Sequence, residues 1–160
     1  MTVVCPVGPM RQLKVSMPAS RTVPGGCCPA GTASLAAIPR ERHLLGLPLS
    51  HADGTQVAAD PAGAAAAART FVEASAGAIV VHFDVDAVDS ADLPLANYPH
   101  HGKGLTFSAA VTVLGELCAS PALAGLVLTE VNPTRDPGGE LLGRYVDGVT
   151  AALAEAARAR

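Results

Sequence analysis

The chain has 160 residues, of which 49% are hydrophobic and 16% charged, enough for one globular domain with a buried core. Its formal net charge of −3 combines five basic and one acidic side chain (+4) in residues 1–50 with six basic and thirteen acidic ones (−7) in residues 51–160. Aromatic residues make up only 3%, and no clustered Lys/Arg run accompanies them, so neither stacking nor charge predicts a nucleic-acid partner.

Residues 1–50 form the first segment. They contain seven of the 13 prolines and five of the 16 glycines, scattered so that no helical or strand period persists. We therefore expect an irregular segment, apart from a short strand that begins at Val3-Val4.

The four cysteines lie at positions 5, 27, 28 and 118 without a Cys-x-x-Cys pair, and no apolar leader follows Met1. This usage predicts reduced thiols and a cytoplasmic location. Cys27 and Cys28 could be combined with His43 and His51 into a zinc site, but their spacing matches none of the usual patterns. No apolar stretch approaches the ~18–20 residues that cross a membrane, so no membrane partner is expected.

Regular structure is predicted from residue 60 onward. Asp60 can cap a helix that has Pro61 at its first position, and the Ala-rich run that follows extends this helix to about residue 75. The apolar run at 78–85 then has the length and the β-branched content of a buried strand.

Three further elements follow a polar, Pro-containing loop. Thr106 caps an amphipathic helix that Pro121 stops, and 125–131 is a second buried strand. A strand, a helix and a strand of these lengths form a right-handed parallel crossover, so both strands end at one edge of the sheet. A terminal helix of about four to five turns carries apolar residues at helical spacing: Leu142, Tyr145, Val146, Val149 and Leu153.

Carboxylates stand at both strand ends. The first strand runs into Asp84-Val85-Asp86, and Glu130 lies at the end of the second. Because strand side chains alternate, we expect Asp84 and Asp86 to point the same way, as hard oxygen ligands of a cation, with Glu130 nearby. Ligands of open α/β sheets bind at such carboxyl ends. The pattern predicts a metal-dependent hydrolase.

An Asp-x-Asp at a strand end occurs in several kinds of enzyme. A phosphatase of the haloacid-dehalogenase type would use Asp84 as nucleophile and Asp86 as acid/base, but it also needs a downstream Lys and an acidic pair, which we do not find. A glycosyltransferase would use the pair to hold a metal and a sugar nucleotide, but no nucleotide pocket is indicated. Both remain outside alternatives.

Three motifs, in order and spacing, resemble the C-terminal part of the arginase/agmatinase (ureohydrolase) family, over residues of about 57 to 155. They are Phe83-Asp84-Val85-Asp86-Ala87-Val88-Asp89, Gly104-Leu105-Thr106-Phe107 and Thr129-Glu130-Val131-Asn132-Pro133. Residues 1–50 show no such resemblance. The resemblance implies an α/β fold over residues 51–160, the C-terminal half of a parallel-sheet, three-layer arginase-like sandwich. It also implies that Asp84 bridges two Mn²⁺ ions, that Asp86 ligates one of them, and that Glu130 pairs with the cation of the substrate.

The implied chemistry agrees with these residue types. Carboxylates suit Mn²⁺, and two ions ~3.5–4 Å apart can activate one water for attack on a guanidino carbon. A guanidinium is a forked donor, for which a carboxylate is the natural acceptor. The expected reaction is hydrolysis of a C–N bond in a linear amidine. It releases urea from arginine, agmatine or a guanidino acid, or formamide from a formimino compound.

Two other segments of the family, Gly-Gly-Asp-His and Asp-Ala-His-x-Asp, supply further metal ligands and do not occur here. Leu49-Ser50-His51-Ala52-Asp53 resembles the second only at His51 and Asp53, and we interpret this likeness as accidental. We therefore expect weak Mn²⁺ binding and poor catalysis by this chain, as though its N-terminal part were truncated and replaced. The alternative is a non-catalytic remnant, or an interaction module that pairs with a complete paralogue or with itself through an exposed sheet edge.

Polar residues beside the motifs receive other roles. We expect His82 to be a hydrogen-bonded strand residue next to the site. Asp89 and Asp92 are interpreted as turn formers or solvated acids, and Asn132 is expected to shape the turn after the second strand.

Overall fold

The computed structural model describes residues 2–4, 12–14, 52, 54–74, 77–99, 101–102 and 104–160. The elements in chain order are β1 (Thr2–Val4), β2 (Gln12–Lys14), α2 (Gly54–Ala59), α3 (Pro61–Glu73), β3 (Ile79–Asp84), the 3-10 turn η1 (Val85–Ala87), α4 (Phe107–Cys118), β4 (Leu123–Thr129), the 3-10 turn η2 (Pro133–Arg135) and α5 (Glu140–Arg158). From α3 onward this order confirms the predicted alternation of helices and strands. None of the described helices is long and apolar enough to cross a membrane.

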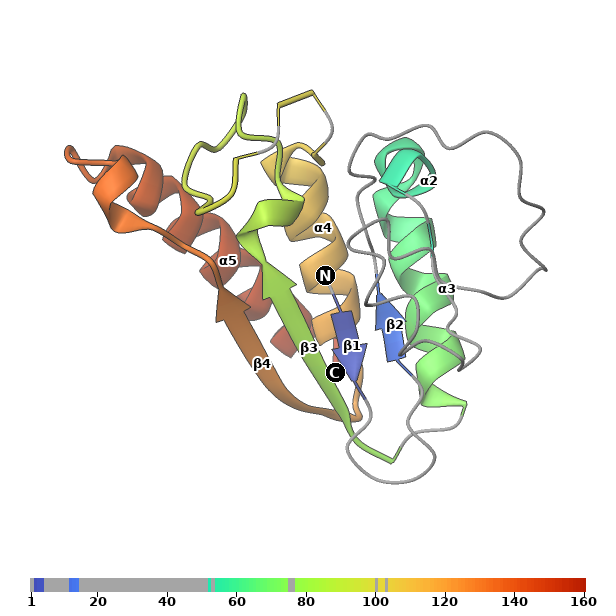
Figure 1. Ribbon diagram of the computed structural model, residues 1–160. Coiled ribbons are helices and arrows are strands. Elements are labelled where there is room, and N and C mark those ends of the chain that lie inside the picture. Colours follow the sequence, from blue (N-terminus) through green and yellow to red (C-terminus); the bar gives the residue numbers. More distant parts are fainter. Residues whose placement is uncertain are drawn as a thin grey trace, which may run out of the picture.

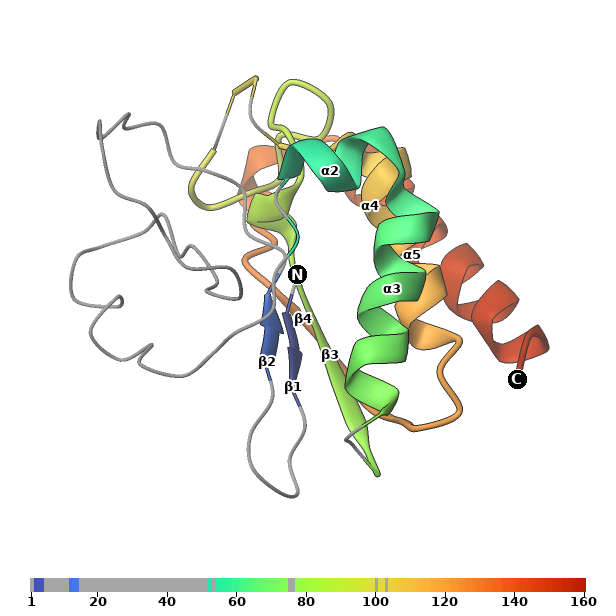
Figure 2. The ribbon, with the colours of Figure 1, turned by 90° about the vertical axis from the view of Figure 1, so that its right-hand side faces the viewer.

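The sheet is built around the parallel pair of β3 and β4. Asp84 at the end of β3 pairs with Thr129 at the end of β4. On its other side β3 pairs antiparallel with β1, and β1 with β2, so the strand order is β2-β1-β3-β4. Figure 1 and Figure 2 show α3, α4 and α5 together on one face of this sheet. The described residues thus form an α/β fold around the predicted parallel crossover.

One edge of the parallel pair differs from the expectation. We expected an exposed sheet edge beside the two parallel strands, but β1 pairs with β3 on one side, with Val3 opposite Val81. Among the described strands, the sheet therefore ends at β2 and at β4. A strand was predicted at Val3-Val4 but not at Gln12–Lys14, because three residues of mixed polarity carry no readable period.

Local capping explains where two helices begin. The Asp60 side chain accepts the backbone N–H of Gly63 at 2.9 Å, with Pro at the first helical position of α3. The Thr106 hydroxyl accepts the N–H of Ala109 at 3.1 Å at the start of α4. Both caps satisfy N–H groups that a helix start leaves unpaired, and both were predicted.

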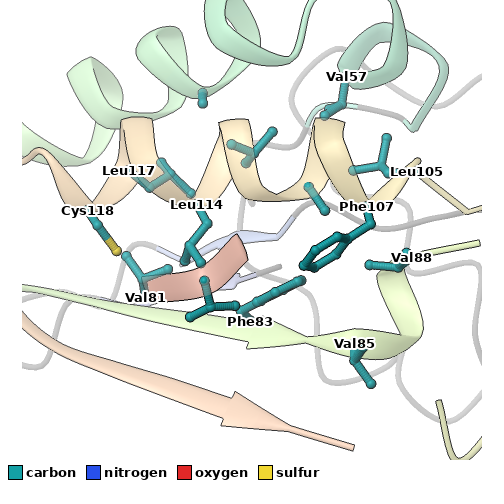
Figure 3. Packing of buried hydrophobic residues seen from close by; sticks show 14 of the residues in the cluster. Val57, Val81, Phe83, Val85, Val88, Leu105, Phe107, Leu114, Leu117 and Cys118 are labelled. Atoms are coloured by element: carbon teal, nitrogen blue, oxygen red, sulfur yellow. The ribbon is translucent and has the colours of Figure 1, made fainter. Parts of the chain in front are cut away.

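The core lies between the sheet and the helices. On β3, Ile79, Val81 and Phe83 are buried, whereas His82 and Asp84 alternate with them on the opposite face and are half-buried. Figure 3 shows Val81 and Phe83 facing Leu114 of α4. The predicted apolar face of α4 is buried as a whole: Ala110, Val113, Leu114 and Leu117. Packing against α4 therefore fixes which face of β3 looks toward the helices.

The terminal helix α5 buries only part of its predicted apolar stripe. Tyr145 and Val149 are buried on it, and the Tyr145 ring lies 6.1 Å from the Phe83 ring and 6.0 Å from the Phe107 ring. Val146, which we predicted for the same stripe, is 48% exposed. The prediction was wrong for this residue because neighbouring positions on a helix point about 100° apart.

Candidate metal and substrate site

The first carboxylates of the site lie where β3 ends. Asp84 is extended, and its Oδ1 accepts the backbone N–H of Asp86 at 2.9 Å, so the Asp84 side chain caps η1. Asp86 lies within that 3-10 turn and not on the strand. The argument from strand alternation is therefore wrong for this pair, because the strand stops at Asp84. Both residues are half-buried, and Oδ1 of Asp86 is buried.

Glu130 directly follows β4. Its neighbour Thr129 pairs with Asp84, so the chain places Asp84 and Glu130 at the same end of two adjacent strands, as predicted. Within the described part of the chain, Glu130 is the one non-glycine residue with a positive φ, 65°. Side chains with a Cβ rarely adopt this conformation, and surrounding contacts must hold it in place.

Those contacts come from Asn97 in the loop after β3. The Asn97 side-chain amide Nδ2 donates to Glu130 Oε2 at 2.8 Å. The backbone N–H of Asn97 donates to the Glu130 carbonyl at 3.2 Å. Sequence reasoning missed Asn97, because an asparagine in an aperiodic Pro-containing loop gives no signal of what it will contact across the sheet.

His82 connects the two strands below these carboxylates. Its Nε2 forms a hydrogen bond of 2.8 Å with Oγ1 of Thr129. Because Thr129 precedes Glu130, this bond helps to fix the end of β4 relative to β3. The expectation of a hydrogen-bonded strand histidine is confirmed.

The remaining carboxylates near the motif have structural contacts. Asp89 Oδ1 accepts the N–H of Ala91 at 2.8 Å, a turn interaction. Asp92 Oδ2 accepts the backbone N–H of Phe107, at the start of α4, at 2.6 Å, and its Oδ1 forms an ion pair of 2.7 Å with Arg144 of α5. The hydrogen bond from Phe107, followed by that from Arg144, lowers the pKa of Asp92 below its usual value. Asp92 thus connects the loop to α4 and α5. It does more than the solvated acid that was one of our two interpretations.

The turn after β4 is also held by a side chain. Asn132 Oδ1 accepts the N–H of Thr134 at 3.0 Å and its hydroxyl at 2.6 Å. This geometry confirms that Asn132 shapes the turn.

Asp84 and Asp86 are the type of ligand that suits Mn²⁺, but two side chains are too few to hold the ion. Asp84 and Asp86 offer the oxygen ligands that Mn²⁺ prefers, and such ions take about six ligands in octahedral geometry. No three His, Cys, Asp or Glu side chains of the described residues gather to hold a metal ion. His51 and Asp53, like Cys27, Cys28 and His43, lie outside the described residues. The described part therefore does not fit a complete metal site.

The sequence profile of the Arginase family matches residues 31–157. The chain belongs to the arginase family. For this arginase-family chain the match begins at residue 31, inside the segment 1–50 in which we found no resemblance, and extends past the last motif. No curated protein sequence matches it.

Solved structures show the same fold. Formimidoylglutamase from Bacillus subtilis has a TM-score of 0.63 and 17% identity, over 74% of this chain and 36% of that one. Arginase from Bacillus caldovelox has a TM-score of 0.61 and 16% identity, over 71% and 38%. Formiminoglutamase from Trypanosoma cruzi, solved with Mn²⁺, has a TM-score of 0.61 and 18% identity, over 75% and 40%. The chain thus corresponds to well under half the length of these relatives.

Proposed function

We propose that this arginase-family chain supplies the C-terminal part of a manganese-dependent ureohydrolase site that hydrolyses a C–N bond in a linear guanidino or amidino compound. Asp84 and Asp86 are the metal ligands of this proposal, and Glu130 binds the substrate cation. The observation that supports this proposal is the register of β3 and β4. Both strands finish at the same end of the sheet, and Glu130 lies one residue beyond Thr129, the partner of Asp84.

Glu130 is suited to hold a planar cation. Its Oε2 accepts a hydrogen bond from Asn97, so its carboxylate has a defined direction, and Oε1 is the oxygen that a guanidinium N–H would reach. A carboxylate and a guanidinium form charge-assisted hydrogen bonds, which are about twice as strong as neutral ones. The residue would therefore both bind the substrate and orient its guanidino carbon.

Asp84 is oriented for a cation by its own turn. Its Oδ1 accepts the N–H of Asp86, which orients the carboxylate, and Asp84 would hold the metal ion together with Asp86. Bound manganese would supply an activated water for attack on the guanidino carbon. The other ligands must come from outside the described residues, so we expect this chain to bind Mn²⁺ weakly and to catalyse poorly when it is alone.

The test measures Mn²⁺ binding to the full chain by the relaxation of water protons. Asp84→Asn and Asp86→Asn should each abolish the binding that the wild type shows, because a neutral amide is a poor ligand for a hard cation. Asp147→Asn, an exposed change on α5, is the matched control and should bind like the wild type. Unchanged Mn²⁺ binding by both site variants would contradict the metal assignment. Release of urea from agmatine and arginine, and of formamide from formiminoglutamate, then ranks the substrate classes.

A second candidate function is that of a non-catalytic interaction module, which pairs either with a second copy of itself or with a complete paralogue. It is favoured by β4, the last described strand on its side of the sheet, where Val127 is 45% and Leu128 42% exposed. Unpaired strand edges with apolar side chains pair readily with other chains. Size-exclusion chromatography with light scattering, on the chain alone and mixed with a complete arginase-family protein, separates these cases. A Val127→Lys variant should weaken the association that this candidate predicts.

A further inference from the structure

The loop after β3 and the segment after β4 are joined by backbone pairing. The N–H of Asn132 donates to the Leu95 carbonyl at 2.8 Å, and that of Asn97 donates to the Glu130 carbonyl at 3.2 Å. Between these two bonds, Ala96 forms an antiparallel bridge with Val131. The stretch from Leu95 to Asn97 therefore runs beside Glu130 as a short additional strand pair.

The loop after β3 is anchored by buried apolar residues, and its last residue, Asn97, lies at the surface. Leu93, Leu95 and Ala96 are each 0% exposed, whereas Asn97 is exposed. Arg135 Nη2 also donates to the Asn97 carbonyl at 3.2 Å. The backbone of Asn97 is therefore anchored by its buried neighbours and by two hydrogen bonds, although its side chain contributes nothing to the core.

The side chain of Asn97 has one described contact, with Glu130. Because an ionised carboxylate only accepts hydrogen bonds, the group that faces it must be the amide NH₂. An anchored donor at 2.8 Å holds Oε2 in place and restricts rotation of the carboxylate. A glutamate side chain without such a donor samples several rotamers, most of which point away from a bound ligand.

We propose that Asn97 is a positioning residue, which fixes Glu130 so that Oε1 faces the guanidinium of the substrate. This inference rests on the proposed function, since it assigns Asn97 a role in the same cation-binding site. It makes the Leu93–Asn97 loop part of that site, although the loop carries none of the family motifs.

The test compares two ligands that differ in one group. Agmatine carries a guanidinium, and N-carbamoylputrescine carries a neutral urea group in its place on the same amine chain. The ratio of their dissociation constants for the full chain, measured by isothermal titration or ligand-observed NMR, reports recognition of the cation. A smaller fraction of folded protein weakens both ligands alike and leaves the ratio unchanged, whereas a local distortion of the site can change it.

Asn97→Ala should lower the preference for agmatine about three- to tenfold, the effect of losing one hydrogen bond that organises a charged group. Asn132→Ala is the matched control, because it makes the same change at the other asparagine of the chain and removes a turn contact without touching the Glu130 carboxylate. Its preference should stay within about twofold of the wild type. Glu130→Gln should abolish the preference altogether.

The outcomes separate the inference from the function on which it rests. A wild-type chain without a preference for agmatine, or a Glu130→Gln variant that keeps it, overturns the substrate role of Glu130 and the role of Asn97 with it. Loss in Glu130→Gln but not in Asn97→Ala overturns the positioning role alone. An equal loss in Asn97→Ala and Asn132→Ala also overturns it, because the loop would then act only as a scaffold.

Discussion

Gly148 of α5 provides the sharpest test of the packing that supports the site. A Cβ at this position would lie 2.6 and 2.7 Å from two atoms of the Phe107 ring, at the start of α4. Phe107 is 4% exposed. The Tyr145 ring centroid is 6.0 Å from it on one side, and the Arg144 guanidinium lies 5.3 Å from its centroid. The ring has little room to move, so Gly148→Ala should force α4 and α5 apart.

Gly143, on the same helix, supplies the matched control. A Cβ there meets nothing within 4 Å. Replacing glycine by alanine within a helix gains up to about 1 kcal/mol from propensity alone, and this gain is common to both variants. Their difference therefore isolates the overpacking, which costs about 1–3 kcal/mol in well-packed cores. We expect Gly143→Ala to be more stable than the wild type and Gly148→Ala to lie about 1–3 kcal/mol below Gly143→Ala.

Urea unfolding followed by circular dichroism gives both free energies of unfolding from fits with a common slope. Two variants that agree within about 0.5 kcal/mol would refute the reasoning, since that is the range of surface changes without a packing cost. Such a result would mean that Phe107 can move into space beside α5. A loss in Gly143→Ala as well would instead point to a general sensitivity of α5.

Two further predictions concern ionisable groups. The hydrogen bond from Phe107 and the contact with Arg144 lower the pKa of Asp92 below 3.8. Its carboxylate therefore stabilises the fold above about pH 4. This contribution to stability disappears as the pH falls through the lowered pKa. Asp92→Asn should cost about 1 kcal/mol at pH 7 and show a shallower loss of unfolding free energy between pH 5 and pH 2; parallel pH profiles would exclude this role. Burial raises the pKa of the Cys118 thiol to about 11. Iodoacetamide at pH 8 should therefore modify Cys118 far faster in urea than in the native chain, and peptide mass spectrometry can measure both rates. Equal rates would show that α4 opens freely.

Local signals were sufficient for most of the elements. The caps at Asp60 and Thr106 act within three residues of sequence, and the apolar run before Asp84 is long enough to specify a buried strand. The parallel pairing of the two strands follows from the lengths of these elements and from the handedness of crossovers. These features could be predicted because each depends on a short stretch of chain.

Of the two features that could not be predicted, one is a local turn and the other is a contact between distant loops. Asp86 leaves the strand because Asp84 caps a 3-10 turn, an interaction that competes with extended structure over only two residues. The contact of Asn97 with Glu130 joins residues 33 positions apart, through a loop without periodicity. Motifs identified the residues of the candidate site, whereas the geometry between them is set by loop packing.

The two halves of the candidate site differ in how completely the described residues build them. The proposed substrate half consists of Glu130, its donor Asn97 and the nearby His82–Thr129 hydrogen bond. All of these contacts lie within the described residues. The metal half offers Asp84 and Asp86 without a third ligand among the described residues. A carboxylate that is already oriented needs no metal to attract a cation, whereas activation of water requires the full set of ligands. Under our proposal, recognition of a guanidino group and hydrolysis of its C–N bond are therefore separable, and the contacts of the described residues support the first more fully than the second.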